Sequence, residues 1–159
     1  MADRAGFEGF YREHHARVVR ACALVVLDHS LAEDVAADAF ARLWARWDAI
    51  QDEDHAGGYV YKTAMRLSAR RAHNARRESI GVADRAGPDQ LESVLVRIDV
   101  FRALSGLPLR QRQAVVLRDW AGFATDRVAA MLGTRESTVR VHLARGRRAL
   151  RRDLHLEEG

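Results

Sequence analysis

The sequence predicts an all-α protein, and two observations lead to that prediction. Apolar residues recur every three or four positions over most of the chain, which is the period of one face of an α-helix. No stretch of useful length alternates apolar and polar residues as a half-buried β-strand does. With 159 residues, 48% of them apolar, the chain can form one ordinary domain or two small ones.

Three helices are expected in the first half, over residues 7–25, 32–47 and 59–77. Ser30 and Glu33 fit a capping box, in which the hydroxyl and the carboxylate close the start of the second helix reciprocally. Behind them runs a wide apolar stripe that ends at Trp47. Residues 48–58 are rich in acids and contain Gly57 and Gly58, so a loop is expected there.

Four more helices are expected after a flexible linker. Residues 79–89 contain Gly81, Gly87 and Pro88 and have little periodicity, which is typical of a linker. Helical patterns follow over residues 91–104 and from Pro108, well placed in a first helical turn, to Trp120. The predicted organisation is an N-terminal three-helix domain, a linker and a C-terminal four-helix domain, over residues 1–78, 79–93 and 94–159.

A helix-turn-helix is predicted in the last third of the chain. A short apolar helix ends at Leu132, Gly133 supplies the turn, and a longer helix follows. That second helix places four residues on one face, namely Val139, Leu143, Gly146 and Leu150. Its other faces carry many arginines, as a helix that enters a DNA major groove requires.

The charge is segregated along the chain in a way that suggests two contacts with a polyanion. The net charge of +4 is made of −5 over residues 1–54, +6 over 55–77, −3 over 78–100, +8 over 101–156 and two final acids. The two basic blocks are candidates for nucleic-acid binding, and the acidic blocks leave a face free for another partner. Solvated helix faces are the alternative explanation of either block.

Several classes of protein are disfavoured. No run of about 18 apolar residues and no secretory signal pattern occurs, so neither membrane insertion nor export is expected. Cys22 is the only cysteine, which favours a reduced, cytoplasmic setting and a buried, inert thiol. No catalytic motif, no cofactor loop and no set of metal ligands at workable spacing is found, so we expect no enzyme, cofactor, metal or small-molecule substrate.

Both halves of the chain contain motifs that resemble those of bacterial RNA polymerase sigma factors. The C-terminal motifs are Leu107-Pro108, Arg112 to Arg118, Gly122-Phe123, Val128-Ala129, Leu132-Gly133, Thr138 to Arg140 and Leu143 to Arg147. The N-terminal motifs are Ala32 to Val35, Asp38 to Phe40, Leu43-Trp44 and Trp47. The likeness is to the compact extracytoplasmic-function (ECF) group, which keeps two domains, and it covers about residues 7–154.

The resemblance implies a function in transcription initiation. The N-terminal domain would bind the clamp of the largest subunit of core RNA polymerase and help to melt the −10 element, and the C-terminal domain would bind the −35 element and the polymerase flap. An anti-sigma factor is implied as a further partner. The implied polymerase-binding residues are Asp34, Asp38, Leu43 and Trp47, the last two of which are alternatively core residues.

The candidate DNA-binding residues form two sets. The third helix supplies aromatic and cationic side chains suited to unstacked −10 bases and phosphates, namely Tyr59, Tyr61, Lys62, Arg66, Arg70 and Arg71. Tyr59 is alternatively a packing residue. The first turns of the recognition helix supply the base-contact candidates Arg135, Glu136, Ser137, Arg140 and Val141. Arg145 and Arg148 are predicted to bind phosphates.

The sequence also departs from the family pattern at a few positions. These positions are Ala37, Arg66, Arg70, Ala124 and Arg135. Because neither Ala124 nor Arg135 is a good helix cap, we expect Thr125 and Thr134 to cap the two helices of the helix-turn-helix instead. Two alternative functions stay open at this point. One is a helix-turn-helix regulator that works without polymerase, and the other is a decoy that binds an anti-sigma factor.

Overall fold

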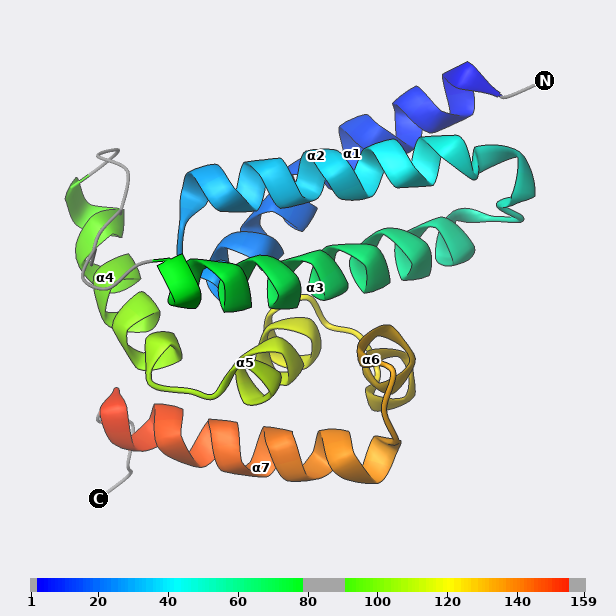
Figure 1. Ribbon diagram of the computed structural model, residues 1–159. Helices are drawn as coiled ribbons and strands as arrows, with labels where there is room; N and C mark the ends of the chain where they lie inside the picture. The colour runs from blue at the N-terminus through cyan, green and yellow to red at the C-terminus, as the bar shows by residue number, and fades with distance from the viewer. Residues whose placement is uncertain (1–2, 79–90, 155–159) are drawn as a thin grey trace.

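The prediction of an all-α protein is confirmed. The computed structural model describes residues 3–78 and 91–154. These residues form the helices α1 (Arg4–Val26), α2 (His29–Ala45), α3 (Glu53–Glu78), α4 (Leu91–Ser105), α5 (Leu109–Val115), α6 (Thr125–Leu132) and α7 (Glu136–Asp153), with a 3₁₀ turn η1 (Trp47–Ala49) and a π-helical turn η2 (Val116–Trp120). Figure 1 shows α1, α2 and α3 side by side above α5, α6 and α7, with α4 at one end.

The predicted capping box at the start of α2 is wrong. The helix begins two residues earlier than that motif allows, and Asp28 is its N-cap, with a carboxylate oxygen that accepts from the Leu31 backbone N–H at 3.1 Å. Glu33 instead pairs with His29 one turn away, at 3.0 Å. The tight turn that carries Asp28 is completed by Leu27, which caps α1 in the left-handed region at φ 60°.

The predicted loop over residues 48–58 is shorter than expected. Helix α3 begins at Glu53, so Gly57 and Gly58 lie inside the helix. Asp52 starts the helix with a carboxylate that accepts from the His55 backbone N–H at 2.8 Å. Asp52 and the acids of the first turn, Glu53 and Asp54, are favoured at a helix N-terminus. This local effect outweighs the low helix propensity of the two glycines.

The C-terminal half contains the predicted helix-turn-helix. Gly133 ends α6 in the left-handed region at φ 65°, where glycine is favoured, and α7 starts three residues later. The N-caps of α6 and α7 are Ala124 and Arg135, neither of which makes a side-chain capping bond, so the expected caps Thr125 and Thr134 are wrong. Residues 79–90 of the predicted linker lie outside the described residues, and residues 91–93 belong to α4.

Two details of the segment before the helix-turn-helix also differ from the prediction. Pro108 is the N-cap of α5 rather than a residue of its first turn. The expected helix through Trp120 changes at Val116 to a π-helical turn, which ends with the Ala121 N–H donating to the Val116 carbonyl at 2.9 Å. Such insertions shift the side chains that follow relative to a regular helix.

Candidate nucleic-acid interface

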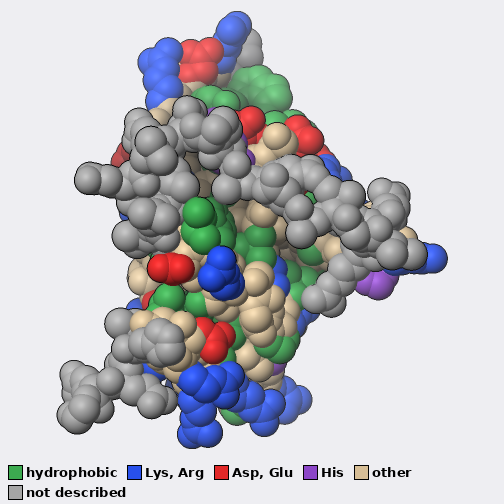
Figure 2. All heavy atoms as spheres, turned by 90° about the vertical axis from the view of Figure 1, so that its left-hand side faces the viewer, with side chains coloured by type: hydrophobic (Ala, Val, Ile, Leu, Met, Phe, Trp, Pro, Cys, Tyr) green, Lys and Arg blue, Asp and Glu red, His purple; other side chains and the backbone are tan. Residues whose placement is uncertain are grey.

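Helix α7 presents its basic side to solvent because its apolar side is used to build the fold. Val139, Leu143 and Gly146 are buried against the rest of the C-terminal half, as predicted, and Leu150 is partly buried. The opposite face is exposed, as the helical period predicts, and consists of Ser137, Val141, Ala144 and Arg148 with Arg140 and Arg145 beside them. Figure 2 shows Lys and Arg side chains gathered at the end of the molecule where α7 lies.

The start of α7 is accessible for base contacts. Arg135 is exposed, Glu136 is half-buried, and Val141 exposes 46% of its surface, a large fraction for an apolar residue in a folded protein. Glu136 and Arg140 lie one turn apart with 3.4 Å between carboxylate and guanidinium, and an exposed pair of this kind is weak. The Arg140 guanidinium therefore loses little interaction energy when it leaves Glu136 to bind the edge of a base.

Arg147 is held by the fold rather than offered to DNA. Its guanidinium donates two hydrogen bonds to Asp119, from Nε at 2.8 Å and from Nη2 at 2.6 Å. The hydrogen bond to Asp119 raises the pKa of Arg147. This bidentate pair fastens α7 to η2. Sequence reasoning missed it because the two residues lie 28 positions apart.

His142 lies beside the basic face of α7, and its pKa is lowered from the ordinary value for histidine. Burial lowers its pKa, and the nearby Arg110 and Arg145 lower it further. The Arg110 guanidinium itself donates to the Leu132 carbonyl, the last residue of α6, at 3.1 Å. Arg110 thus satisfies a carbonyl at the end of the first helix of the motif and helps to set the angle between the two helices.

Helix α3 divides the predicted −10 set into an exposed and a covered group. Lys62, Arg66 and Arg70 are exposed and spaced four residues apart, so they form one basic stripe along the helix. Tyr61 is 3% exposed and therefore has no free ring face in this conformation, and Tyr59 is half-buried against the core. Both aromatic members of the set are used in packing.

Arg71 and Asp38, from two different predicted sites, bind one another. The Arg71 guanidinium donates to a carboxylate oxygen of Asp38 at 2.7 Å, and Arg42 donates to the other oxygen at 3.1 Å. Arg71 therefore fastens α3 to α2. Asp34 is exposed on the same helix.

The two apolar residues of the predicted polymerase set lie in the fold rather than on its surface. Leu43 is fully buried in the core. Trp47 is partly buried, and its ring lies 5.4 Å from that of Phe7 and 5.9 Å from that of Phe10. Both positions match the alternative reading of these residues as core. The exposed side chains of α2 include those of Asp34, Arg42 and Trp44, and Trp44 is 40% exposed.

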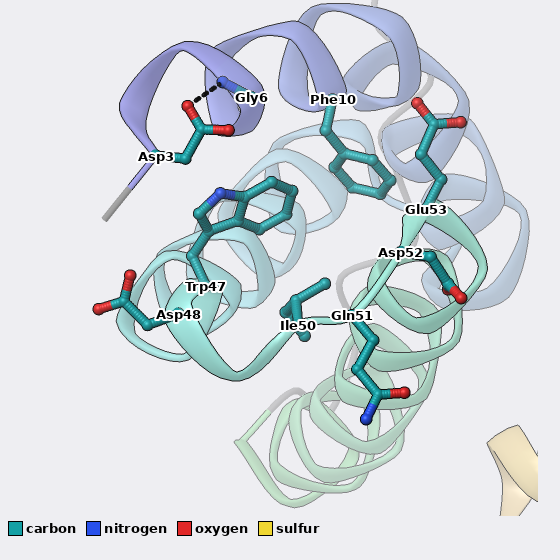
Figure 3. Close-up of a pocket in the computed structure, with 9 residues that line it drawn as sticks. All are labelled: Asp3, Gly6, Phe10, Trp47, Asp48, Ile50, Gln51, Asp52 and Glu53. Atoms are coloured by element: carbon teal, nitrogen blue, oxygen red, sulfur yellow. Dashed lines mark hydrogen bonds between the residues drawn. The ribbon is translucent and has the colours of Figure 1, made fainter. Parts of the chain in front are cut away.

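An acid-rimmed hollow lies where the N-terminus of α1 meets η1 and α3. It has a volume of about 470 Å³, and Phe10, Trp47 and Ile50 form its apolar wall. Figure 3 shows the carboxylates at its edge, which belong to Asp3, Asp48, Asp52 and Glu53. The acids would repel a phosphate group, so this hollow lies outside the candidate DNA surface.

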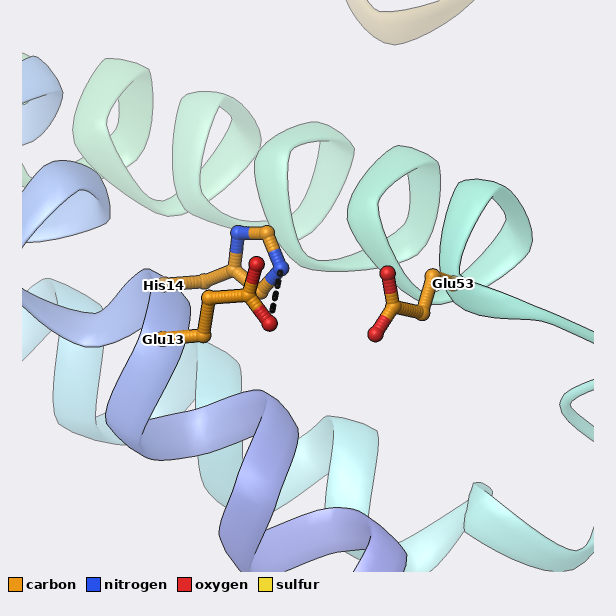
Figure 4. A group of neighbouring side chains, drawn as sticks. All are labelled: Glu13, His14 and Glu53. Carbon is orange, nitrogen blue, oxygen red and sulfur yellow. Dashed lines mark ion pairs between the residues drawn. The ribbon is translucent and has the colours of Figure 1, made fainter.

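A neighbouring group of side chains has metal-ligating chemistry. Glu13, His14 and Glu53 place ligand atoms within 4.8 Å of one another, and His14 Nε2 lies 4.0 Å from a Glu13 oxygen (Figure 4). Glu13 and Glu53 are exposed and free to hydrate. The group was not anticipated, because Glu53 lies 40 residues after Glu13 and 39 after His14 in sequence.

The arrangement defines a two-part DNA-binding protein with a helix-turn-helix in one half and a basic helix in the other. Its family is established by comparison with known proteins. The family models described as "Sigma-70 region 2" and "Sigma-70, region 4" match residues 10–78 and 97–150. The chain belongs to the sigma-70 family of RNA polymerase sigma factors, and to its ECF group. Members of this family are transcription initiation factors, not enzymes.

Curated relatives match over nearly the full chain. An RNA polymerase sigma-E factor of Streptomyces coelicolor is 29% identical over 97% of this chain and 89% of its own length. ECF RNA polymerase sigma factor SigM of Mycobacterium tuberculosis is 28% identical over 94% of this chain and 78% of its own length.

The solved structures that share the fold include two complexes. The sigma factor RpoE of Bartonella quintana, in complex with the anti-sigma factor NepR, superposes with a TM-score of 0.81 at 21% identity, over 96% of this chain and 99% of its own. CnrH, in complex with the cytosolic domain of CnrY, superposes with a TM-score of 0.75 at 18% identity. The match covers 98% of this chain and 92% of the CnrH chain. Among the described residues, no helix is both long and apolar enough to cross a membrane.

Proposed function

We propose that this sigma factor directs core RNA polymerase to promoters whose −35 element is read by the outward face of α7. The observation that carries the proposal is the split of that helix between a buried apolar face and an exposed face of arginine, serine and valine. Arg135, Ser137 and Arg140 supply donors for base edges, and Val141 supplies an apolar contact for a thymine methyl group. Arg145 and Arg148, farther along the helix, bind phosphates.

In this proposal the stripe Lys62, Arg66 and Arg70 guides the −10 strand along α3, as phosphate contacts rather than base contacts. Its spacing of four residues places a cation about every 6 Å along the helix, close to the spacing of phosphates on an extended strand. Domains over residues 1–78 and 94–159 bind the −10 and −35 elements respectively. A cytoplasmic location follows, since polymerase and promoters are there.

Asp34 is the side chain best placed to bind a basic surface of the polymerase clamp. It is exposed on α2, whereas Asp38 is already paired with Arg42 and Arg71. Reversal of Asp34 to arginine should therefore weaken core binding without loss of fold. Reversal of Asp38 should in addition loosen the contact between α2 and α3, which thermal unfolding would register.

An anti-sigma factor is proposed as a further partner. The two solved structures named above are complexes, one of the sigma factor RpoE with the anti-sigma factor NepR and one of CnrH with the cytosolic domain of CnrY. The same fold over nearly the whole chain supports a comparable partner here.

The experiment that tests the proposal is run-off transcription with purified core polymerase and a promoter library. Transcription from a defined subset of promoters supports it. Replacement of Arg140 by alanine should lower discrimination at one −35 position by roughly 5- to 150-fold, the range for loss of a bidentate contact. Arg20→Ala, an exposed arginine of α1 outside both DNA sets, is the matched control. Failure of the chain to start transcription or to co-elute with core would refute the proposal.

A further inference from the structure

Three side chains with metal-ligating groups converge between α1 and the start of α3. Glu13 and His14 are neighbours on α1, and Glu53 is the first residue of α3. One ligand atom of each side chain lies within 4.8 Å of those of the other two. Figure 4 shows the Glu53 carboxylate reaching from the first turn of α3 toward the other two side chains. Within residues 3–78 and 91–154, no other three His, Cys, Asp or Glu side chains come so close together.

The imidazole of His14 contributes a buried nitrogen that has no hydrogen-bond partner among the described residues. This nitrogen is Nε2. A Glu13 oxygen lies 4.0 Å from it, which is too far for a hydrogen bond. Leaving a buried polar atom unpaired costs free energy, so such an atom needs an explanation. A metal ion bound between the three side chains would give Nε2 a partner, because a neutral imidazole nitrogen is a common metal ligand.

The core of the N-terminal half holds the His14 ring in place. The ring lies against that of Phe10, with 4.3 Å between centroids and 35° between planes, and Phe10 is only 3% exposed. The imidazole is therefore ordered before any ion binds. A ligand that is already ordered loses less conformational entropy on binding, which favours affinity.

The two carboxylates have no arginine or lysine partner in the part of the chain that the structure describes. The ion pairs of its arginines use other acids. The chain contains 26 lysines and arginines, so cations are not scarce. The arginines of neighbouring turns are engaged elsewhere, since Arg17 donates to the Ala121 carbonyl at 2.8 Å and Arg127 lies 3.5 Å from the Asp54 carboxylate. The negative charge of Glu13 and Glu53 is thus available to a cation from solution.

The surroundings of Glu53 attract cations although the whole chain is basic. Glu53 also belongs to the rim of the hollow described above, where Asp3, Asp48 and Asp52 add three further carboxylates (Figure 3). Acids gathered at a concave surface create a negative local potential, and this potential raises the local concentration of cations.

The distances and the kinds of ligand fit a divalent transition-metal ion. Zinc binds histidine nitrogen and carboxylate oxygen at about 2.0–2.2 Å, so two ligand atoms of one tetrahedral ion lie about 3.4 Å apart. The three side chains would therefore need to close by about 1 Å. Glu13 and Glu53 are exposed and can rotate by that much without loss of packing. An imidazole nitrogen also favours zinc and its neighbours over Mg²⁺ and Ca²⁺, which prefer oxygen ligands.

We propose that Glu13, His14 and Glu53 form a binding site for a divalent transition-metal ion, of which Zn²⁺ suits the ligands best. The ion ties the first turn of α3 to α1, because two ligands come from one helix and the third from the other. Three protein ligands leave a fourth position for water. This site goes beyond promoter recognition and does not rest on the proposed function.

A competition titration with Zn²⁺ and a chromophoric chelator tests the site on the full chain without an affinity tag. We expect one tightly bound ion for each chain. Outer-shell partners of metal sites are typically worth 10- to 100-fold in affinity, so loss of a direct ligand in Glu13→Gln or Glu53→Gln should weaken Zn²⁺ binding by at least about tenfold. Glu53→His replaces one ligand by another and should bind Zn²⁺ more tightly than Glu53→Gln does.

His29→Gln is the matched control. His29 is exposed, and a single carboxylate, that of Glu33, lies 3.0 Å from its Nε2. This pair has two of the three groups that the proposed site combines, so its loss should leave the affinity for Zn²⁺ unchanged. Far-ultraviolet circular dichroism and the Tm without metal show whether each variant is folded.

Hydrogen exchange tests the link between the two helices. Saturation with Zn²⁺ should slow amide exchange in the first two turns of α3 in the original chain but not in Glu53→Gln, where any remaining ion is held by α1 alone. At about 100 times the Kd, Zn²⁺ should also raise the Tm of the original chain by roughly 5–10 °C. Long-range ¹H–¹⁵N spectra should show a Zn²⁺-dependent shift of His14 Nε2.

Two results would overturn the site. One is the absence of Zn²⁺ binding by the original chain. The other is equal affinity in the original chain, Glu13→Gln and Glu53→Gln, which would mean that scattered surface histidines bind the ion. Neither result bears on promoter recognition, which the run-off assay tests separately. A chain that binds Zn²⁺ as expected but never starts transcription would keep the site and refute the proposed function.

Discussion

Replacement of Gly146 by alanine is expected to add one methyl group where α7 packs most closely on α5. Gly146 is buried inside α7, and a Cβ there would lie 2.9 Å from Val115 Cγ2 and 3.6 Å from Gln111. Overfilling a packed site costs about 1–3 kcal/mol, and the β-branched Val115 has little freedom to turn away. Alanine also favours a helix over glycine by about 1 kcal/mol. The net expected effect is a loss of about 0–2 kcal/mol in the free energy of unfolding.

Gly9 provides a matched control for this substitution. It lies inside α1 and is exposed, and a Cβ there meets nothing within 4 Å. Gly9→Ala should therefore raise the free energy of unfolding by about 1 kcal/mol, because only the helix preference acts. The two variants should thus differ by about 1–3 kcal/mol, the penalty of the contact with Val115.

Urea unfolding followed by far-ultraviolet circular dichroism measures both variants. A double-mutant cycle with Val115→Ala tests the contact directly. Once the valine methyl groups are gone, Gly146→Ala should raise the free energy of unfolding instead of lowering it. If Gly146→Ala stabilises the chain as much as Gly9→Ala does, the helices α5 and α7 do not pack as described and the reasoning is refuted.

Three further predictions concern a cap, a thiol and a phosphate contact. Asp28→Ala should lower the free energy of unfolding by about 1 kcal/mol through loss of the α2 cap, with Ser30→Ala much closer to neutral in the same thermal scans; equal losses would contradict the observed cap. Burial raises the pKa of Cys22 from 9.0 to about 12, so its thiol should resist alkylation at pH 9 until urea is added. The free energy of unfolding should fall above about pH 9, because the thiol of the unfolded chain ionises at a lower pH than that of the folded chain. Rapid alkylation of the folded chain would disprove the burial. Arg148→Ala should reduce the slope of log affinity against log salt for promoter binding by the holoenzyme by about one, and an unchanged slope would exclude a phosphate contact.

The recognition helix could be predicted because its information is local. The spacing of Val139, Leu143 and Gly146 fixes which side of α7 faces the core, and the exposed side follows from the helical period alone. Gly133 similarly marks a left-handed turn that few other residues adopt. The outward positions of Ser137 and Arg148 are confirmed for the same reason.

The ends of the helices were predicted less well because several groups compete for them. Ser30, Thr125 and Thr134 are all suitable caps, yet Asp28, Ala124 and Arg135 occupy the cap positions. The choice depends on where the chain reverses and on what the preceding helix leaves room for. Propensity is a weak guide when alternatives differ by less than about 1 kcal/mol.

The sequence by itself determined the helices, their inward faces, the charge blocks and the resemblance that defines the family. The tertiary structure decided which of the charged and aromatic side chains are free. The Tyr61 ring packs against Phe123, the Arg71 guanidinium pairs with Asp38, and the Arg147 guanidinium pairs with Asp119. Each partner lies at least 28 positions away in sequence. The helical period determines which side of the helix a residue faces. Only the packing of segments distant in sequence determines whether another part of the chain already occupies that side.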